Sequence, residues 1–164
     1  SRLSMVSDFV KDTIVELRDT IWAMNQHHID IEDLKIRIAN FIENATRSVP
    51  NMRFTFHDEL GENWRPEYDS KTGMNIYRVI QEAVNNAVKH SKASEVVVKV
   101  STQNQQIIFE ISDNGSGFQA DQNYEGKGLS SMQKRASEVE ATLRLTSSEN
   151  GTTIILTLNQ IPRS

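Results

Sequence analysis

A short segment at 113–118 carries residue types that could bind a nucleobase. It combines the carboxylate of Asp113 with Gly115 and Gly117, and it follows directly after a strand-like run, Ile107–Ile111. The carboxylate can accept a hydrogen bond from a ligand amine, and the glycines let the backbone turn and approach that ligand closely. Because Asp-Asn-Gly is also a common turn sequence, this segment needs support from other parts of the chain.

A second segment could hold a metal ion and a phosphate. Glu82 and Asn86 are four residues apart in a run that reads as a helix, so they share one face, and Lys89 and His90 continue the polar surface. A carboxylate and an amide oxygen at this spacing can organise Mg²⁺, which prefers oxygen ligands and shares them with substrate phosphates. The alternative is an amphipathic helix with a solvated polar face.

Two further segments offer ligand contacts. A Gly-rich stretch at 126–129 opens a helix, where backbone N–H groups and the positive end of the helix dipole favour an anion. A Gly-Thr-Thr stretch at 151–153 precedes the last strand and offers hydroxyl groups. Taken singly, a flexible loop closed by a helix start explains the first stretch equally well, and a hairpin turn explains the second stretch better than a ligand contact does. The candidate residues are Gly126, Lys127, Gly128, Leu129, Thr152 and Thr153.

The elements that must position these residues cluster by type instead of alternating strictly. Apolar residues at spacings of three and four predict helices over 1–25, 30–49, 75–89 and 129–139. Alternating runs predict strands over 52–56, 96–100, 107–111, 141–146 and 153–158, with loops at 59–68 and 113–128. This arrangement favours a layer of helices on a mixed or largely antiparallel sheet.

Composition excludes several classes of protein. The 164 residues fit one domain with an appendage, and the net charge of −4 with no basic patch gives no support for nucleic-acid binding. There are no cysteines, so disulfides and thiolate metal sites are absent. No apolar run approaches the roughly 20 residues that span a bilayer. We therefore expect a cytoplasmic chain without membrane contact, and tethering of a longer parent protein to the inner membrane stays open.

The order and spacing of the four segments resemble the N, G1, G2 and final Gly-Thr boxes of the GHKL ATPase superfamily. The pattern Glu82-x-x-x-Asn86-Ala87-x-Lys89-His90 is most similar to the catalytic domains of two-component sensor histidine kinases of the nitrate-sensor and desaturase-sensor type. A Met-Gln-x-Arg-Ala stretch at 132–136 also fits this group. The resemblance covers roughly residues 30 to 160.

The resemblance implies a Bergerat fold, a two-layer α/β (α+β) sandwich whose mixed, mostly antiparallel sheet is covered on one face by helices. One long N-terminal helix precedes it. Residues 1–28 would be part of a dimerisation and phosphotransfer hairpin with its hinge, and residues 29–164 would be the ATP-binding catalytic domain. A homodimer through the N-terminal helix is then expected.

The resemblance also implies ATP and Mg²⁺ as cofactors and assigns residues to them. Asp113 would accept the adenine amine with support from Thr153 and a water, while Gly115 and Gly117 start a lid close to the base. Asn86 would be the Mg²⁺ ligand, and Glu82 would position or deprotonate water or the nucleophile. Lys89 and His90 would lie at the phosphates or ribose. The residues that close the lid would be Gly126, Lys127, Gly128 and Leu129.

The implied function is transfer of the ATP γ-phosphoryl group to a histidine on a separate helix, and from there to a response regulator. The helix that carries this histidine in the family is missing from these 164 residues, so we do not expect this chain alone to phosphorylate itself. The His57-Asp58 pair lies at the end of a strand-like run, which disfavours it as the acceptor. Two alternatives remain at this point: a nucleotide-binding pseudo-kinase or interaction domain, and a Ser/Thr kinase of the anti-sigma-factor type.

Overall fold

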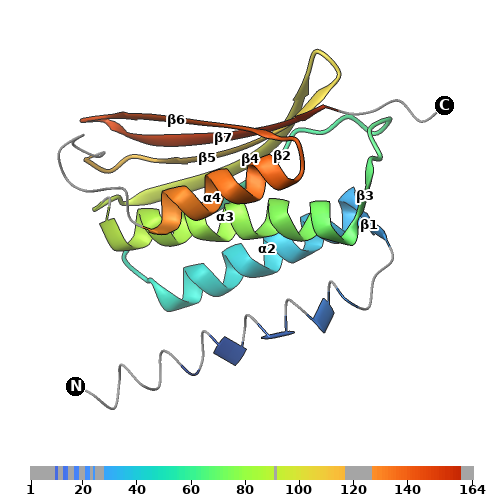
Figure 1. Cartoon of the computed structure of the whole chain (residues 1–164). Coiled ribbons are helices and arrows are strands. Elements are labelled where there is room, and N and C mark those ends of the chain that lie inside the picture. Colours follow the sequence, from blue (N-terminus) through green and yellow to red (C-terminus); the bar gives the residue numbers. More distant parts are fainter. Residues whose placement is uncertain are drawn as a thin grey trace.

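The computed structural model describes residues 10, 13–14, 17–18, 21–22, 24, 28–90, 92–116 and 127–159 (Figure 1). A five-stranded sheet has the order β2-β4-β5-β7-β6. The β2–β4 pair is parallel and the other pairs are antiparallel, which confirms the predicted mixed, mostly antiparallel sheet. The strands are β2 (Arg53–Asp58), β4 (Glu95–Gln103), β5 (Gln106–Asp113), β6 (Thr142–Ser148) and β7 (Gly151–Asn159).

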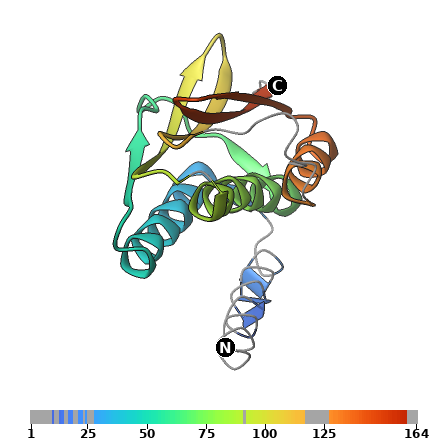
Figure 2. The ribbon, with the colours of Figure 1, turned by 90° about the vertical axis from the view of Figure 1, so that its left-hand side faces the viewer.

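Three helices cover one face of this sheet, as the sequence predicts: α2 (Ile31–Ser48), α3 (Ser70–His90) and α4 (Lys127–Glu138) (Figure 2). Alternate residues of each strand face the helices. In β5, for example, Ile107, Phe109 and Ile111 are buried. Burial of these side chains against the apolar stripes of the helices supplies the main stabilising term of the fold.

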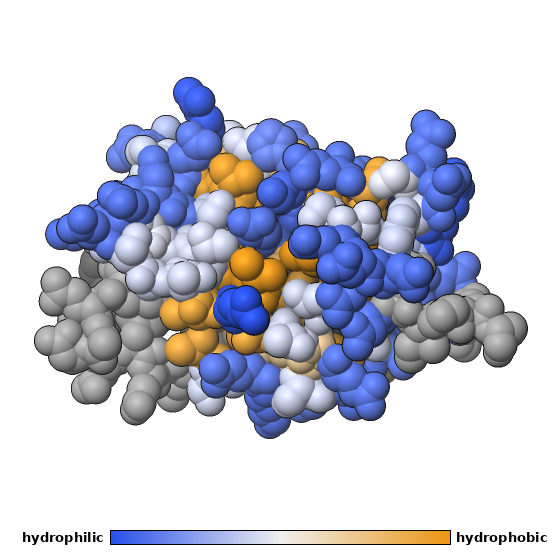
Figure 3. All heavy atoms as spheres, turned by 90° about the horizontal axis from the view of Figure 1, so that it is seen from above, coloured by the Kyte–Doolittle hydropathy of each residue, from blue (hydrophilic) through white to orange (hydrophobic). Residues whose placement is uncertain are grey.

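The other face of the sheet is turned to solvent. Figure 3 shows this face as largely hydrophilic, with smaller hydrophobic areas between the polar side chains. An ion pair between Lys99 and Glu110 joins β4 to β5 there, with 3.4 Å between Nζ and Oε2. The fold is therefore a two-layer sandwich, in agreement with the predicted class.

A small second sheet was not predicted. β1 (His28–Asp30) pairs antiparallel with β3 (Glu67–Asp69), which lies at the end of the expected loop. Strands of three residues are too short for an alternating pattern to stand out. Gly73 of α3 lets this sheet pack closely, because a Cβ atom there would lie 2.8 Å from Cδ1 of Ile29.

Helix α3 begins five residues before the predicted start. The carboxylate of Asp69 accepts a hydrogen bond from the N–H of Thr72 at 2.7 Å, the arrangement of a helix cap. Hydrogen bonds from Thr72 hold the pKa of Asp69 below its ordinary value. The first turn carries little apolar periodicity, so the cap and not the pattern sets the start of the helix.

The β4–β5 hairpin is longer than predicted. Its turn consists of Asn104 and Gln105, with φ angles of 53° and 62°, in place of the expected six-residue connection. Positive φ at both central residues matches the twist of the flanking strands. The polar residues on either side of the turn therefore continue the strands.

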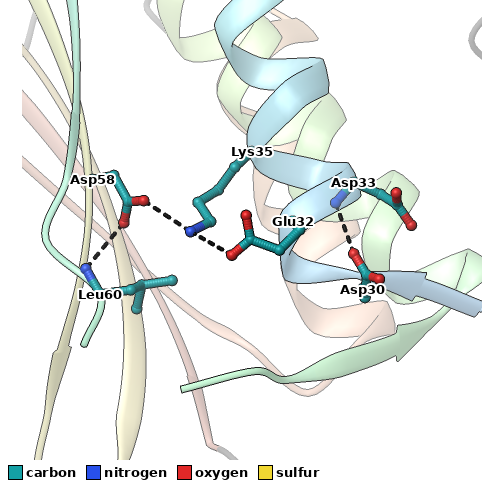
Figure 4. Close-up of polar contacts among 6 residues, drawn as sticks. All are labelled: Asp30, Glu32, Asp33, Lys35, Asp58 and Leu60. Atoms are coloured by element: carbon teal, nitrogen blue, oxygen red, sulfur yellow. Dashed lines mark hydrogen bonds and ion pairs between the residues drawn. The ribbon is translucent and has the colours of Figure 1, made fainter. Parts of the chain in front are cut away.

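A cluster of charged side chains ties α2 to the edge strand β2 (Figure 4). Nζ of Lys35 lies 2.8 Å from a carboxylate oxygen of Glu32 and 2.8 Å from one of Asp58. Asp30 caps the N-terminus of α2, since its side chain accepts a hydrogen bond from the N–H of Asp33 at 2.7 Å. Asp58 thus has a structural role in joining two elements.

The described residues between 10 and 24 are helical, in agreement with the predicted N-terminal helix. Apolar side chains are exposed there, including Val10, Ile14, Leu17 and Ile21. Trp22 contacts the body of the molecule through Arg37, whose guanidinium carbon lies 4.6 Å from the ring centroid. Among the helices in the described part of the chain, none combines the length and apolar character needed to cross a bilayer.

Candidate functional site

Asp113 lies at the end of β5, beside the first residues of β7. Its backbone pairs with Val96 of β4 on one side and Thr152 of β7 on the other. Its carboxylate accepts a hydrogen bond from the N–H of Gly115 at 2.9 Å, so the chain turns immediately after the strand. The half-buried carboxylate therefore has a fixed place at one end of the sheet.

Thr152, and not Thr153, shares a face of the sheet with Asp113. Residues directly opposite each other on antiparallel strands project to the same side, and Asp113 is opposite Thr152. Thr152 is buried, and its hydroxyl lies 3.1 Å from that of Ser147. Thr153 is opposite Ser112 on the solvent face. Strand register therefore places Thr152, and not the expected Thr153, on the same face as Asp113, in a strand that begins two residues earlier than predicted.

Gly151 allows β7 to reach the backbone of Asp113. Its φ of 136° is strained for any other residue, and a Cβ atom there would lie 2.0 Å from the carbonyl oxygen of Asp113. The sequence marks this glycine only as part of a turn. Its role in the site becomes visible from the approach of two strands that are 38 residues apart in the chain.

Asn114 fastens the start of the loop to β4, a role that the sequence analysis missed. Its side-chain oxygen accepts hydrogen bonds from the N–H groups of Ser94 at 2.9 Å and Glu95 at 3.0 Å. Its side-chain NH₂ donates to the Ser94 hydroxyl at 2.9 Å, and its backbone N–H donates to the Glu95 carbonyl at 3.3 Å. These bonds fix the backbone directly after Asp113. The one signal of this role in the sequence is that an asparagine directly follows Asp113.

The polar face of α3 approaches the same end of the sheet. Glu82 and Asn86 are half-buried, while Lys89 and His90 at the end of the helix are exposed. The chain runs from His90 to Glu95 in a short connection, and Glu95 lies next to Asn114. The structure thus brings the end of α3 and the segment around Asp113 to one edge of the molecule.

The oxygen atoms on α3 suit a hard divalent cation that is shared with a phosphate. The side chains of Glu82 and Asn86 offer a carboxylate and an amide oxygen, ligand types that Mg²⁺ prefers. Among the described residues, no group of three or more His, Asp or Glu side chains is arranged to hold a metal ion. A cation bound here would therefore complete its coordination with phosphate oxygens and water.

The predicted lid is only partly described. Gly117 and Gly126 lie outside the described residues, and of Lys127 and Gly128 only the backbone, at the start of α4, is described. Leu129 is half-buried and packs against the core, and Met132 and Ala136 on the same helix are buried. The N-terminus of α4 is thus anchored through apolar contacts, and the roles of the lid residues stay predictions.

Comparison with known proteins identifies a family and relatives of this chain. A family model described as histidine kinase-, DNA gyrase B-, and HSP90-like ATPase matches residues 72–162. DegS of Brevibacillus brevis, a signal transduction histidine-protein kinase/phosphatase, is 32% identical over 155 residues, which cover 91% of this chain and 38% of DegS. The sensor histidine kinase ComP of Bacillus subtilis is 27% identical over 152 residues, which cover 90% of this chain and 19% of ComP.

The fold is likewise shared with solved structures. The catalytic domain of histidine kinase ThkA matches with a TM-score of 0.64 at 18% identity, covering 83% of this chain and 97% of that one. The chain thus matches a whole catalytic domain of known structure but well under half the length of the two relatives above. With the family model matching more than half of its residues, the chain belongs to the family of histidine kinase-, DNA gyrase B- and HSP90-like ATPases.

Proposed function

We propose that the chain is the ATP-binding catalytic domain of a sensor histidine kinase of the nitrate-sensor and desaturase-sensor type. The observation that carries this proposal is the placement of Asp113 beside Thr152 at the edge where α3 presents Glu82 and Asn86. The family match and the similarity to sensor histidine kinases support it.

In this proposal the adenine ring binds at the end of β5. The Asp113 carboxylate accepts a hydrogen bond from the exocyclic amine, and the hydroxyl of Thr152 supports a bridging water. Gly115 is buried next to Asp113, which lets the base approach the backbone. Its N–H already donates to the carboxylate, so the carboxylate is oriented before ATP binds.

The triphosphate would lie between α3 and the N-terminus of α4. Asn86 would hold Mg²⁺, which supplies charge neutralisation to the phosphates when bound, and Lys89 and His90 would contact phosphate or ribose. Glu82 would orient or deprotonate the attacking group. Phosphoryl transfer depends mostly on positioning and charge neutralisation, so the domain needs no covalent nucleophile of its own. The lid residues would be Gly117, Gly126, Lys127, Gly128 and Leu129.

The γ-phosphoryl group would pass to a histidine outside these residues and then to an aspartate of a response regulator. His57 is a poor acceptor because it lies in β2 between Phe56 and Asp58, and Asp58 reaches Lys35 on the helix side. His57 therefore projects to the solvent face of the sheet, away from the proposed site.

A metal titration of an Asn86→Ala variant tests this assignment. We expect ATP affinity without Mg²⁺ to stay within about twofold of the unsubstituted chain, while the gain in affinity on adding Mg²⁺ disappears. Asn85→Ala, at an exposed neighbouring position, is the matched control and should keep the gain. Equal effects of the two substitutions would contradict a metal-binding role for Asn86. If the unsubstituted chain bound ATP but transferred no phosphoryl group to an added acceptor domain, the result would favour a pseudo-kinase.

A further inference from the structure

The dipeptide Asn-Gly occurs twice in the sequence, as Asn114-Gly115 and as Asn150-Gly151. This dipeptide is prone to spontaneous deamidation, because glycine has no side chain that would keep its backbone nitrogen away from the asparagine amide. Both copies lie at the end of the sheet that carries Asp113, one directly after β5 and the other at the β6–β7 turn. Their surroundings decide which copy can react.

Hydrogen bonds hold the first copy on both sides of the bond that would form. The side-chain oxygen of Asn114 accepts from the N–H groups of Ser94 and Glu95, and its NH₂ donates to the Ser94 hydroxyl. The N–H of Gly115, whose nitrogen would have to attack, donates to the carboxylate of Asp113. These four hydrogen bonds keep the side chain of Asn114 turned away from Gly115.

The second copy is open to solvent. Asn150 is exposed and forms the β6–β7 turn together with Glu149, between the end of β6 at Ser148 and the start of β7 at Gly151. Its backbone N–H donates to the Ser148 hydroxyl at 3.1 Å, but its side-chain amide forms no hydrogen bond with another described residue. Gly151 and Ser148 are the last pair of the β6–β7 ladder, and strand ends open most readily.

The reaction at this copy needs water and no other reagent. The backbone nitrogen of Gly151 loses its proton and attacks Cγ of Asn150, which closes a cyclic imide. The bond between Cγ and Nδ2 breaks, and ammonia leaves with the proton. Water then opens the ring at either carbonyl. One product is aspartate on an unchanged backbone, and the other is isoaspartate, whose backbone runs through the former side chain and is longer by one carbon atom.

The position of Gly151 makes a longer backbone consequential. A Cβ atom at Gly151 would lie 2.0 Å from the carbonyl oxygen of Asp113, so the two backbones are in close contact. The next residue, Thr152, is directly opposite Asp113. An extra backbone carbon immediately before Gly151 would therefore shift the start of β7 against Asp113. The aspartate product keeps the backbone path and only adds a charge at an exposed position.

We propose that Asn150 is a site of spontaneous deamidation in the folded chain, and that isoaspartate there loosens the contact of β7 with Asp113. The contact is part of the nucleotide site only if the function proposed above holds. In that case the ageing chain loses ATP affinity, although no residue that contacts the ligand has been altered.

Peptide mapping by mass spectrometry, after incubation of the full chain at mildly alkaline pH, tests the site of reaction. In the folded chain we expect Asn150 to convert at least about tenfold faster than Asn114, because hydrogen bonds hold only Asn114. Both copies follow an acidic residue, Asp113 or Glu149, and the urea-unfolded chain gives the reference rate of each. Equal protection of the two copies by folding would overturn the proposal.

The isoaspartate form, purified by chromatography, is compared with Asn150→Asp, which carries the same charge on an unaltered backbone. We expect the isoaspartate form to unfold at a lower urea concentration and to bind ATP about fivefold more weakly than Asn150→Asp. Asn150→Gln, whose longer side chain closes the ring far more slowly, should keep its stability and ATP affinity on incubation.

Equal unfolding midpoints of the isoaspartate form and Asn150→Asp would overturn the proposed effect on β7. A freshly prepared chain that binds no ATP would contradict the proposed function alone. Peptide mapping and the unfolding midpoints need no nucleotide, so they would still decide this inference.

Discussion

At the scale of single residues, the proposed adenine site depends on how the backbone around Asp113 is held. Asn114 joins this backbone to β4 through its side chain, and Gly151 lets β7 approach it. Neither residue needs to contact a ligand to matter. Both hold the backbone from which the Asp113 side chain projects, and the sharpest predictions at this scale concern them.

Replacing Asn114 should impair nucleotide binding without abolishing the fold. Asn114→Ala removes three side-chain hydrogen bonds, and because the site is exposed we expect a loss of about 1 kcal/mol in the free energy of unfolding. ATP affinity should fall by more than this loss explains, since Asp113 becomes less well oriented. Chemical denaturation and ATP titration measure the two effects. Asn150→Ala in the exposed β6–β7 turn is the control, and equal results for both would contradict the role of Asn114.

Gly151→Ala should be strongly destabilising. Its Cβ would collide with the Asp113 carbonyl oxygen and its φ would be strained, so we expect a loss of at least about 2 kcal/mol in the free energy of unfolding. Gly61→Ala is the matched control, because a Cβ there would lie 3.7 Å from Trp64, an ordinary contact distance. Urea unfolding measures the free energy of unfolding of both variants. Similar values for the two would show that β7 approaches Asp113 less closely than described.

At the scale of elements, the connection between α2 and β2 rests on Lys35. Burial favours the neutral forms of Lys35 and Asp58, yet the hydrogen bonds that favour their charged forms outweigh it. Asp58 accepts hydrogen bonds from Lys35 and from the N–H of Leu60, and these lower its pKa below 3.8. Lys35 donates hydrogen bonds to Asp58 and Glu32, and these raise its pKa. A carboxylate with a lowered pKa stabilises the folded state above its unfolded pKa, and this contribution is lost as the pH falls through its folded pKa.

Asp58→Asn should therefore change how stability depends on pH. Near pH 7 we expect it to cost less than about 1 kcal/mol, since the pair is partly exposed and screened by salt. Below about pH 3.8 the difference between the variant and the unsubstituted chain should shrink as Asp58 becomes protonated. Thermal unfolding between pH 3 and pH 7 measures this. A difference that stays constant across this range would contradict the ion pair.

Most elements could be predicted from periodicity, because their apolar faces are buried in one core. The stripe Ile76, Val79, Ile80, Ala83 and Ala87 of α3 is an example, and every member is buried. The start of α3, by contrast, is set by a hydrogen bond to Asp69, and the β1–β3 pair depends on contact between distant segments. The choice of Thr152 over Thr153 likewise follows from strand register, which one sequence does not specify.

At the scale of the whole molecule, the two ends of the sheet differ in chemistry. One end carries Asp113, Thr152 and the polar residues of α3, and the other carries a cavity whose lining includes Glu67, Asp69, Glu138 and Glu140. The N-terminal helix adds a third surface, where Val10, Ile14, Leu17 and Ile21 are between 44% and 56% exposed. Exposed apolar side chains at helical spacing favour association with another helix.

We expect this N-terminal surface to mediate homodimer formation. Ile14→Glu with Ile21→Glu should shift the chain toward monomer in analytical ultracentrifugation, because burying a carboxylate in an apolar interface is unfavourable. Ile36→Glu introduces a charge at another exposed isoleucine, on α2, and should leave association unchanged. A chain that is monomeric at all concentrations before substitution would contradict the expected dimer.

The central claim is that Asp113 recognises adenine, and calorimetric titration of ATP into the unsubstituted chain and Asp113→Asn tests it most directly. Losing a charge-assisted hydrogen bond should weaken ATP binding by about 1–3 kcal/mol, and GTP, which lacks the amine at that position, should bind poorly to both proteins. Asp33→Asn on the exposed side of α2 should bind ATP normally. Equal ATP affinity of the unsubstituted chain and Asp113→Asn would contradict the account.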